Sequence, residues 1–174
     1  MCAVVPVMDG RTTGALPEDF ATFYEREFAA IALIAGTTAG DRTIGEDIAQ
    51  EALARANERW ANLANFDKPG AWVRRGAINL ALDDRRRQGS RRRAVEQLEA
   101  SASRVPTTRA GDPAVWAAVD TLPPRQRSVV VLHYFEDRRV AEIADILDIS
   151  VSATTSHLHK ARTALAARLG GGSR

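Results

Sequence analysis

Near the end of the chain, one short stretch carries side chains that suit contact with nucleic acid. Thr155, Ser156, His159, Lys160 and Arg162 share one face of an expected helix. Hydroxyls and imidazoles form hydrogen bonds with base edges, and cations pair with phosphates. The pattern predicts a helix that lies in the major groove of duplex DNA. Periodicity alone equally allows a plain amphipathic hairpin with a solvated outer face.

A second basic cluster lies near the middle of the chain. Eight arginines fall between positions 74 and 93, opposed there only by Asp83 and Asp84. Such a block indicates either a phosphate-binding patch or a solvated arm.

The apolar spacing around the first stretch predicts two helices separated by a tight turn. The first helix has an apolar stripe at i, i+3, i+4 and i+7, formed by Val140, Ile143, Ala144 and Leu147. Residues 148–150 interrupt this spacing, and a serine there can cap the next helix. The second helix has its own stripe, formed by Thr154, Leu158, Ala161 and Leu165. Two helices joined in this way are typical of a helix-turn-helix.

The rest of the chain also favours helices, and no strand alternation of any length occurs. Helices are expected from about residue 17, over 44–60 and over 71–87, with a breaker at 36–41. Val129 to Leu132 is expected to be helical because of its flanks. We predict an all-α fold of two small helical domains, residues 17–93 and 113–170. A flexible linker at 94–112 joins them, so we expect them to move independently, and residues 1–16 form a flexible tail.

Composition excludes several classes of protein. The 174 residues carry a formal net charge of +2 and one cysteine, Cys2, which excludes a disulfide framework and a cysteine metal cluster. No apolar run approaches a membrane span, and the first residues lack the basic start of a signal peptide. Adjacent carboxylates such as Asp83-Asp84 diverge on a helix, so no enzyme site is expected. We expect a cytoplasmic protein without cofactor or metal.

Several short motifs, in a fixed order, resemble the extracytoplasmic-function (ECF) group of bacterial RNA polymerase sigma factors. They lie at residues 46–53, 71–75 with 79–83 and 85–87, 122–127 and 142–144. The resemblance covers about residues 18–168. It implies a transcription initiation factor that binds core RNA polymerase, recognises −35 duplex DNA, and melts and captures the −10 strand.

The same resemblance implies roles for residues in each domain. Residues 17–93 correspond to sigma domain 2 and residues 113–170 to sigma domain 4. The residues expected to bind core polymerase are Asp47, Gln50, Glu51 and Arg55. Those expected to bind the −10 element are Asn62, Asn65, Phe66, Lys68, Arg74, Arg75, Arg85, Arg86 and Arg87. Those expected to bind the −35 element are Arg138, Arg139, Thr155, Ser156, His157, His159, Lys160 and Arg162. An anti-sigma factor is a further expected kind of partner.

The recognition helix departs from the usual pattern of the family. Thr155 and His157 stand where relatives commonly have basic residues, and Arg138-Arg139 stands where a capping serine is common. These departures leave the −35 sequence open. The alternative to a sigma factor is a stand-alone helix-turn-helix regulator of duplex DNA, but that reading does not explain the first domain.

Overall fold

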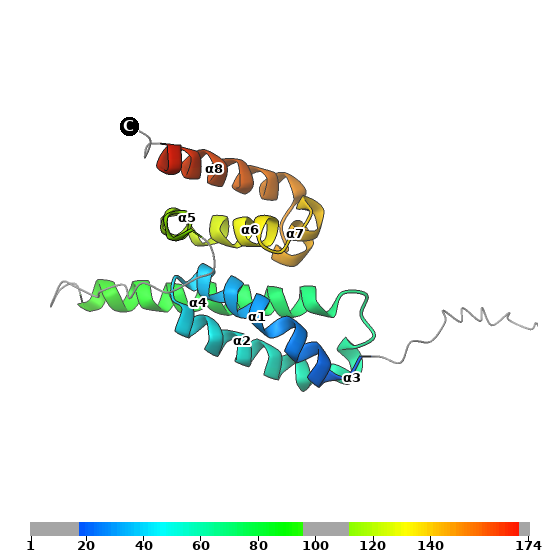
Figure 1. Ribbon diagram of the computed structural model, residues 1–174. Coiled ribbons are helices and arrows are strands. Elements are labelled where there is room, and N and C mark those ends of the chain that lie inside the picture. Colours follow the sequence, from blue (N-terminus) through cyan, green and yellow to red (C-terminus); the bar gives the residue numbers. More distant parts are fainter. Residues whose placement is uncertain (1–17, 96–111, 171–174) are drawn as a thin grey trace, which may run out of the picture.

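The computed structural model describes residues 18–95 and 112–170, with side chains left out at 90–95. The predicted tail and most of the predicted linker lie outside these residues. The described residues form eight helices and no strand (Figure 1). None of these helices is long and apolar enough to cross a membrane.

Four helices form the N-terminal group: α1 (Phe20–Ala39), α2 (Arg42–Asn57), α3 (Trp60–Leu63) and α4 (Pro69–Val95). Aspartates begin the first two helices, because Asp19 accepts a hydrogen bond from the Thr22 amide and Asp41 accepts one from the Thr43 amide. α1, α2 and α4 bury a shared core of apolar side chains, which includes Phe23, Ile31, Ile48, Leu53 and Val73.

The predicted breaker at 36–41 is wrong at its start, because α1 continues through Gly36. The helix ends only at Gly40, whose φ of 88° is the left-handed conformation that glycine adopts readily. Gly36 instead lies against Gly45 of α2. A Cβ on Gly45 would lie 2.4 Å from the Gly36 Cα and 2.7 Å from the Ala32 carbonyl oxygen. The two glycines therefore let α1 and α2 approach closely.

The predicted end of the third long helix is also wrong. α4 continues to Val95 rather than ending near residue 87. Side-chain pairs one turn apart accompany its extension, since Arg86 contacts Asp83 at 3.1 Å and Gln88 donates to Asp84 at 2.7 Å.

The C-terminal group is α5 (Pro113–Val119), α6 (Pro124–Tyr134), α7 (Val140–Leu147) and α8 (Val151–Leu169). The predicted helix-turn-helix is confirmed in α7 and α8. Asp148 ends α7 in the left-handed region, with φ of 55°, and Ser150 begins α8 by accepting the Ala153 amide. Val129 to Leu132 lies within α6, as predicted.

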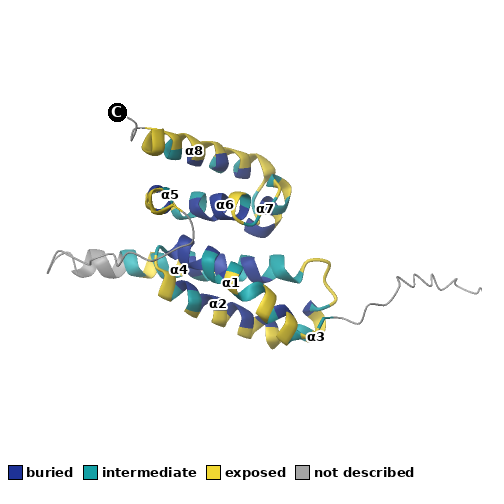
Figure 2. Ribbon diagram, viewed as in Figure 1, coloured by how far each residue is buried: buried dark blue, intermediate teal, exposed yellow. Residues whose placement is uncertain are grey.

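The two groups of helices pack against each other (Figures 1 and 2). Ile34 of α1 and Ile78 of α4 are buried in the same apolar cluster as Val130, Leu132 and Ile146 of the C-terminal group. Nothing in the sequence patterns predicts this contact. A buried apolar contact of this kind opposes the free relative motion that two linked domains otherwise show.

We predict that Gly45→Ala destabilises the chain. The added Cβ overlaps the backbone of α1, and overpacking of this kind costs about 1–3 kcal/mol. Gly76→Ala in α4 is the matched control, since a Cβ there meets nothing within 4 Å. That control should be neutral or stabilising by up to about 1 kcal/mol, because alanine is the better helix former. Urea unfolding of both variants gives the comparison, and equal stability would contradict the close glycine contact.

Candidate nucleic-acid interface

The outer face of α8 presents the polar side chains that the sequence predicted. Thr155, Ser156, His159 and Lys160 are all exposed. Thr154, Leu158 and Ala161 are buried on the opposite side, which holds the helix against its group. The exposed face thus offers short polar groups and a cation in the arrangement that base edges and phosphates require.

His157 does not share this exposed face. Its side chain is half-buried, and its Nδ1 is buried without a hydrogen-bond partner. Burial lowers the pKa of His157, and the positive charges of Lys160 and Arg125 lower it further. The expected groove contact of His157 is therefore not supported by its position, because the other four residues face solvent and His157 faces the protein.

Arg162 is exposed but is held in place by side chains of α6. Its Nε donates to the Tyr134 hydroxyl at 2.7 Å, and Nη2 lies 3.2 Å from the Nε2 of His133. A guanidinium only donates, so His133 Nε2 accepts and Nδ1 carries the hydrogen. That Nδ1 lies 3.1 Å from the Arg138 carbonyl, which completes the arrangement. Arg162 is thereby oriented beside the recognition face.

The first turn of α7 is capped by Glu142, although no serine precedes the helix. The backbone N–H of Arg139 donates to Glu142 Oε2 at 3.1 Å, and this hydrogen bond lowers the pKa of Glu142. The Arg139 side chain makes no capping bond and the residue is exposed. Arg138 is less free, since its guanidinium lies within 4 Å of Glu136 and Glu142.

The loop between α3 and α4 presents a second polar surface. Asn65, Phe66 and Lys68 of this loop are exposed, and Phe66 has 53% of its surface accessible. Asn62 is exposed as well, but it lies in α3 and not in the predicted loop. The Asn65 side-chain amide donates to the Ala61 carbonyl at 2.9 Å, which orients it. An exposed phenylalanine beside amides and a lysine is suited to stack on an unpaired base.

The arginine cluster of α4 divides into two kinds of residue. Arg86 and Arg87 are exposed, although Arg86 also pairs with Asp83. Arg85 instead donates from Nη1 to the Ala39 carbonyl at 3.1 Å and so caps the C-terminal end of α1. The sequence assigned all three to phosphates, but Arg85 has a structural contact that the other two lack.

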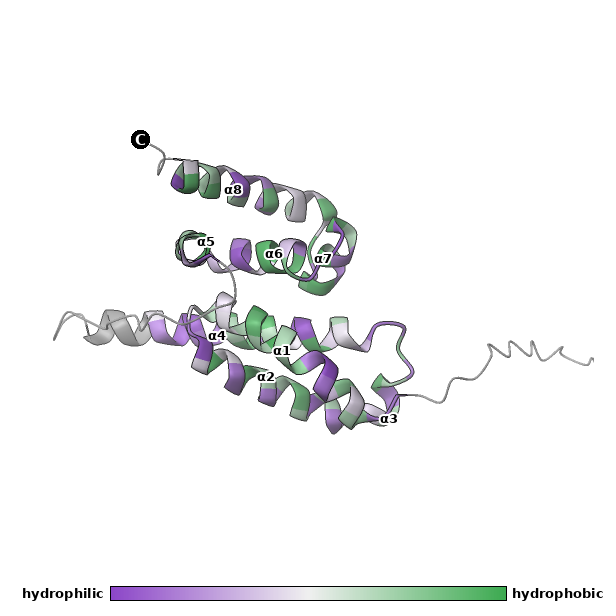
Figure 3. Ribbon diagram, viewed as in Figure 1, coloured by the Kyte–Doolittle hydropathy of each residue, from purple (hydrophilic) through white to green (hydrophobic). Residues whose placement is uncertain are grey.

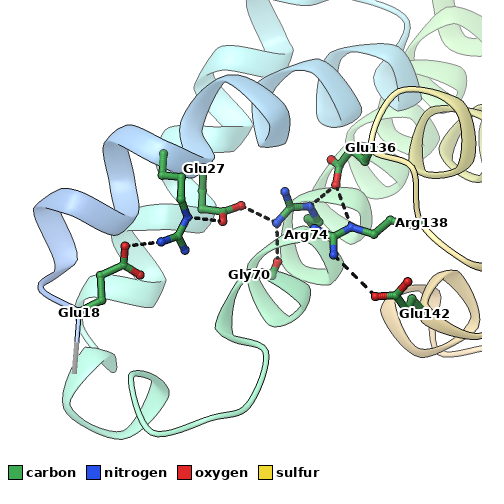
Figure 4. Close-up of polar contacts among 8 residues, drawn as sticks. Glu18, Glu27, Gly70, Arg74, Glu136, Arg138 and Glu142 are labelled. Carbon is green, nitrogen blue, oxygen red and sulfur yellow. Dashed lines mark hydrogen bonds and ion pairs between the residues drawn. The ribbon is translucent and has the colours of Figure 1, made fainter. Parts of the chain in front are cut away.

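Arg74 is buried, which the sequence did not predict (Figure 4). It is 4% exposed, and its Nη1 lies 2.6 Å from Glu27 while its Nε lies 2.6 Å from Glu136. Nη1 also donates to the Gly70 carbonyl at 3.2 Å. Glu27 belongs to α1 and Glu136 follows α6, so one cation joins both groups of helices. Arg74 is not available to a phosphate in this arrangement.

The charge of Glu27 is maintained by this contact. Burial alone raises the pKa of Glu27, but the charge of Arg74 and the hydrogen bonds from Arg74 and Arg26 outweigh it, so the pKa is lowered. The ion pairs continue on both sides: Arg26 pairs with Glu27 and Glu18, and Arg138 lies within 4 Å of Glu136 and Glu142 (Figure 4). We call Glu27, Arg74 and Glu136 the interdomain triad.

Arg75 also reaches across to the C-terminal group. Its Nε donates to the Ile146 carbonyl at 3.2 Å, and its Nη2 donates to the Asp145 carbonyl. These carbonyls lie in the last turn of α7, where a helix presents partial negative charge. Arg74 and Arg75, both predicted −10 contacts, are therefore engaged within the chain.

Arg127, the last residue of the motif at 122–127, has a structural role. It is only 2% exposed and donates to the carbonyls of Leu122, at 2.8 Å, and of Asp120. Its Nη1 also donates to the Thr37 carbonyl of α1 at 3.3 Å. The guanidinium thus holds the turn between α5 and α6 and contacts the N-terminal group.

The four predicted polymerase contacts lie together on α2. Asp47, Gln50, Glu51 and Arg55 are exposed, and Arg55 forms an ion pair with Glu51 one turn away. Ala49, Ala52 and Leu53 are buried between them. Figure 3 shows hydrophilic residues recurring along α2. The helix therefore has one face for the core and one charged face for solvent or a partner.

Two known protein families match this chain, one over each group of helices. The chain matches the sigma-70 region 2 family over residues 23–91 and the sigma-70 region 4 family over residues 113–165. An RNA polymerase sigma-E factor of Streptomyces antibioticus is 34% identical over 122 residues, which span 70% of this chain and 68% of that protein. The ECF RNA polymerase sigma factor SigW of Bacillus subtilis is 30% identical over 142 residues, spanning 71% of this chain and 74% of that protein.

Solved structures share the fold. The sigma factor RpoE from Bartonella quintana, in complex with the anti-sigma factor NepR, superposes with a TM-score of 0.70 at 19% identity, over 90% of this chain and 99% of that chain. CnrH, in complex with the cytosolic domain of CnrY, gives a TM-score of 0.60 at 25% identity, over 88% of this chain and 89% of that chain. The first likeness, at such low identity, shows the fold alone.

A region 2 fold followed by a region 4 helix-turn-helix defines a sigma-70 type initiation factor. The chain belongs to the ECF group of RNA polymerase sigma factors. It is thus a transcription initiation factor that directs RNA polymerase to promoters. The match of residues 23–91 to region 2 decides against a stand-alone regulator, because such a regulator has no use for that region.

We predict that the α4 arginines separate into two effects. Arg86→Ala with Arg87→Ala should weaken promoter complexes of the holoenzyme and lower the slope of log K against log salt by up to about 0.7–0.9 per lost phosphate contact. Arg85→Ala should instead lower the free energy of unfolding by about 1 kcal/mol, through loss of the hydrogen bond to Ala39. Filter binding over a salt series and urea unfolding measure the two effects. An unchanged salt slope in the double variant would make these arginines a solvated arm.

Proposed function

We propose that the charged face of α2 is the surface through which this sigma factor docks on core RNA polymerase. The observation that carries the proposal is the exposure of Asp47, Gln50, Glu51 and Arg55 on one helix face that neither group of helices covers. An acid-bearing rim of this kind sets the register and the rate of association with a charged partner.

Promoter recognition is divided between the two groups of helices. The exposed face of α8, with Ser156, His159 and Lys160, reads the −35 duplex in the major groove. The loop with Asn65 and Phe66, together with Asn62 at the adjoining end of α3, captures the melted −10 strand, because an exposed loop accepts an unstacked base whereas a helix in the groove reads paired ones. Arg86, Arg87 and Arg139 add contacts to phosphates.

The chain acts by binding and has no catalytic activity of its own. The adjacent carboxylates that a nuclease would use for a metal are already engaged along α4, since Asp83 pairs with Arg86 and Asp84 accepts from Gln88. Its place of action is the cytoplasm, where bacterial polymerase works on promoter DNA. An anti-sigma factor is a further partner, supported by the fold shared with RpoE in its complex with NepR.

The test is a charge reversal on α2. Asp47→Arg with Glu51→Arg should abolish capture of core polymerase, because two carboxylates one turn apart become two cations facing the same partner surface. Both residues are exposed, so the fold should persist by circular dichroism.

The matched control is Glu25→Arg with Asp145→Arg, two exposed carboxylates on α1 and α7. It makes the same change of net charge away from α2 and should retain capture of core polymerase. Capture by the α2 variant at wild-type strength, or equal loss in the control, would show that the docking face has been misassigned.

A further inference from the structure

We propose that the recognition helix α8 reads the 5-methyl group of a thymine in the −35 duplex through Val151 and Thr155, two side chains in its first turns. The inference rests on the proposed function, in which α8 lies in the major groove, and it adds the base that this end of the helix selects. The sequence patterns assign Thr155 to DNA as a polar contact and do not assign Val151. Thr155 stands where relatives commonly have a basic residue, so the contact distinguishes this chain from them.

Val151 is an apolar side chain that the fold leaves in solvent. It is the first residue of α8, directly after the Ser150 cap, and it is 53% exposed. Single exposed apolar residues are common on protein surfaces, but this one stands at the end of a recognition helix that meets base edges. Leu169, which is also exposed, is the last residue of α8 and lies about 27 Å away along the helix axis. Val151 is therefore the exposed apolar group placed to enter the groove.

Thr155 adds a methyl group to the same part of the helix. Its Oγ1 donates to the Val151 carbonyl at 2.9 Å, one turn earlier on α8. A threonine hydroxyl has one hydrogen to donate, and this bond uses it. The residue is exposed, so the γ-methyl group is the apolar surface that its side chain offers to a groove. Residues at i and i+4 are neighbours on a helix, and Val151 and Thr155 thus form one small apolar patch.

The major groove offers one apolar group that complements such a patch. Adenine, guanine and cytosine present hydrogen-bond donors and acceptors there, and thymine adds a methyl group to its acceptor. Contact of the valine and threonine methyl groups with the thymine methyl removes apolar surface from water. Ser156 and His159, on the exposed face of α8, are left to form hydrogen bonds with neighbouring bases. The patch therefore favours thymine over cytosine, the pyrimidine without a methyl group.

Promoter selection followed by removal of single methyl groups from the DNA tests the proposal. The full chain, assembled with core RNA polymerase, selects −35 sequences from a promoter library randomised over that element. The selected element should hold a thymine at one fixed position on either strand. Uracil, which lacks only the 5-methyl group, then replaces each thymine in turn. Replacement at the contacted position should weaken the promoter complex about fourfold, the factor expected for one buried methyl group.

Thr155→Ser with Val151→Ala removes the methyl groups on the protein side. Serine keeps the hydroxyl that bonds to the Val151 carbonyl, and both residues are exposed, so the fold should persist. This double variant should bind thymine and uracil promoters equally. Thr163→Ser is the matched control, because Thr163 is exposed on the same helix and its Oγ1 donates in the same way to the His159 carbonyl, at 3.1 Å. The control should keep the preference for thymine.

Each other outcome has a definite meaning. A selected −35 element without a fixed thymine, or one in which uracil replaces every thymine without loss, would overturn the methyl contact and leave α8 as the −35 reader. A preference for thymine that persists in the double variant would assign the methyl group to other side chains and overturn the proposal as well. Selection of no sequence at −35 would instead contradict the proposed function of α8, and this inference with it. The two failures are thereby distinguished.

Discussion

Arg74 is a buried cation, and the arrangement of the two groups of helices depends on how its charge is neutralised. A buried guanidinium is tolerated only when it is paired and its donors are satisfied. Glu27 supplies one carboxylate from α1, Glu136 supplies the other from beyond α6, and Gly70 supplies a carbonyl. Removal of one partner from a buried ion pair typically costs about 3–5 kcal/mol, because the remaining charge is left without compensation.

The apolar part of the interface has a different role from the triad. Ile34 and Ile78 contribute buried apolar area, and the hydrophobic effect that stabilises it is not directional. The ion pairs of the triad, in contrast, fix which residues face one another. Arg127 adds a link of its own, since it holds the α5–α6 turn and touches the Thr37 carbonyl. Residues that would serve DNA or the local fold thus also join the two groups.

The local features of the fold followed from short-range patterns. The stripes of α7 and α8, the turn at Asp148 and the exposed face of α8 all depend on residues within a few positions of each other. The same holds for the charged face of α2. The features that the sequence did not predict depend on partners far away in the chain. Gly36 stays helical because Gly45 packs on it, and Arg74 is buried by carboxylates 47 and 62 positions away. Periodicity carries no information about such pairs, and the same limit explains why it did not predict the contact of Arg85 with the Ala39 carbonyl or the half-buried position of His157.

The most direct test is the distance between the two groups of helices in solution. Spin labels on exposed positions Asn57 of α2 and Thr163 of α8, in the Cys2→Ser background, report it by double electron–electron resonance. The free chain should give one short, narrow distribution, because the buried apolar contact and the interdomain triad hold the two groups together. A broad, long distribution in the free chain would contradict the packing of the two groups through the interdomain triad.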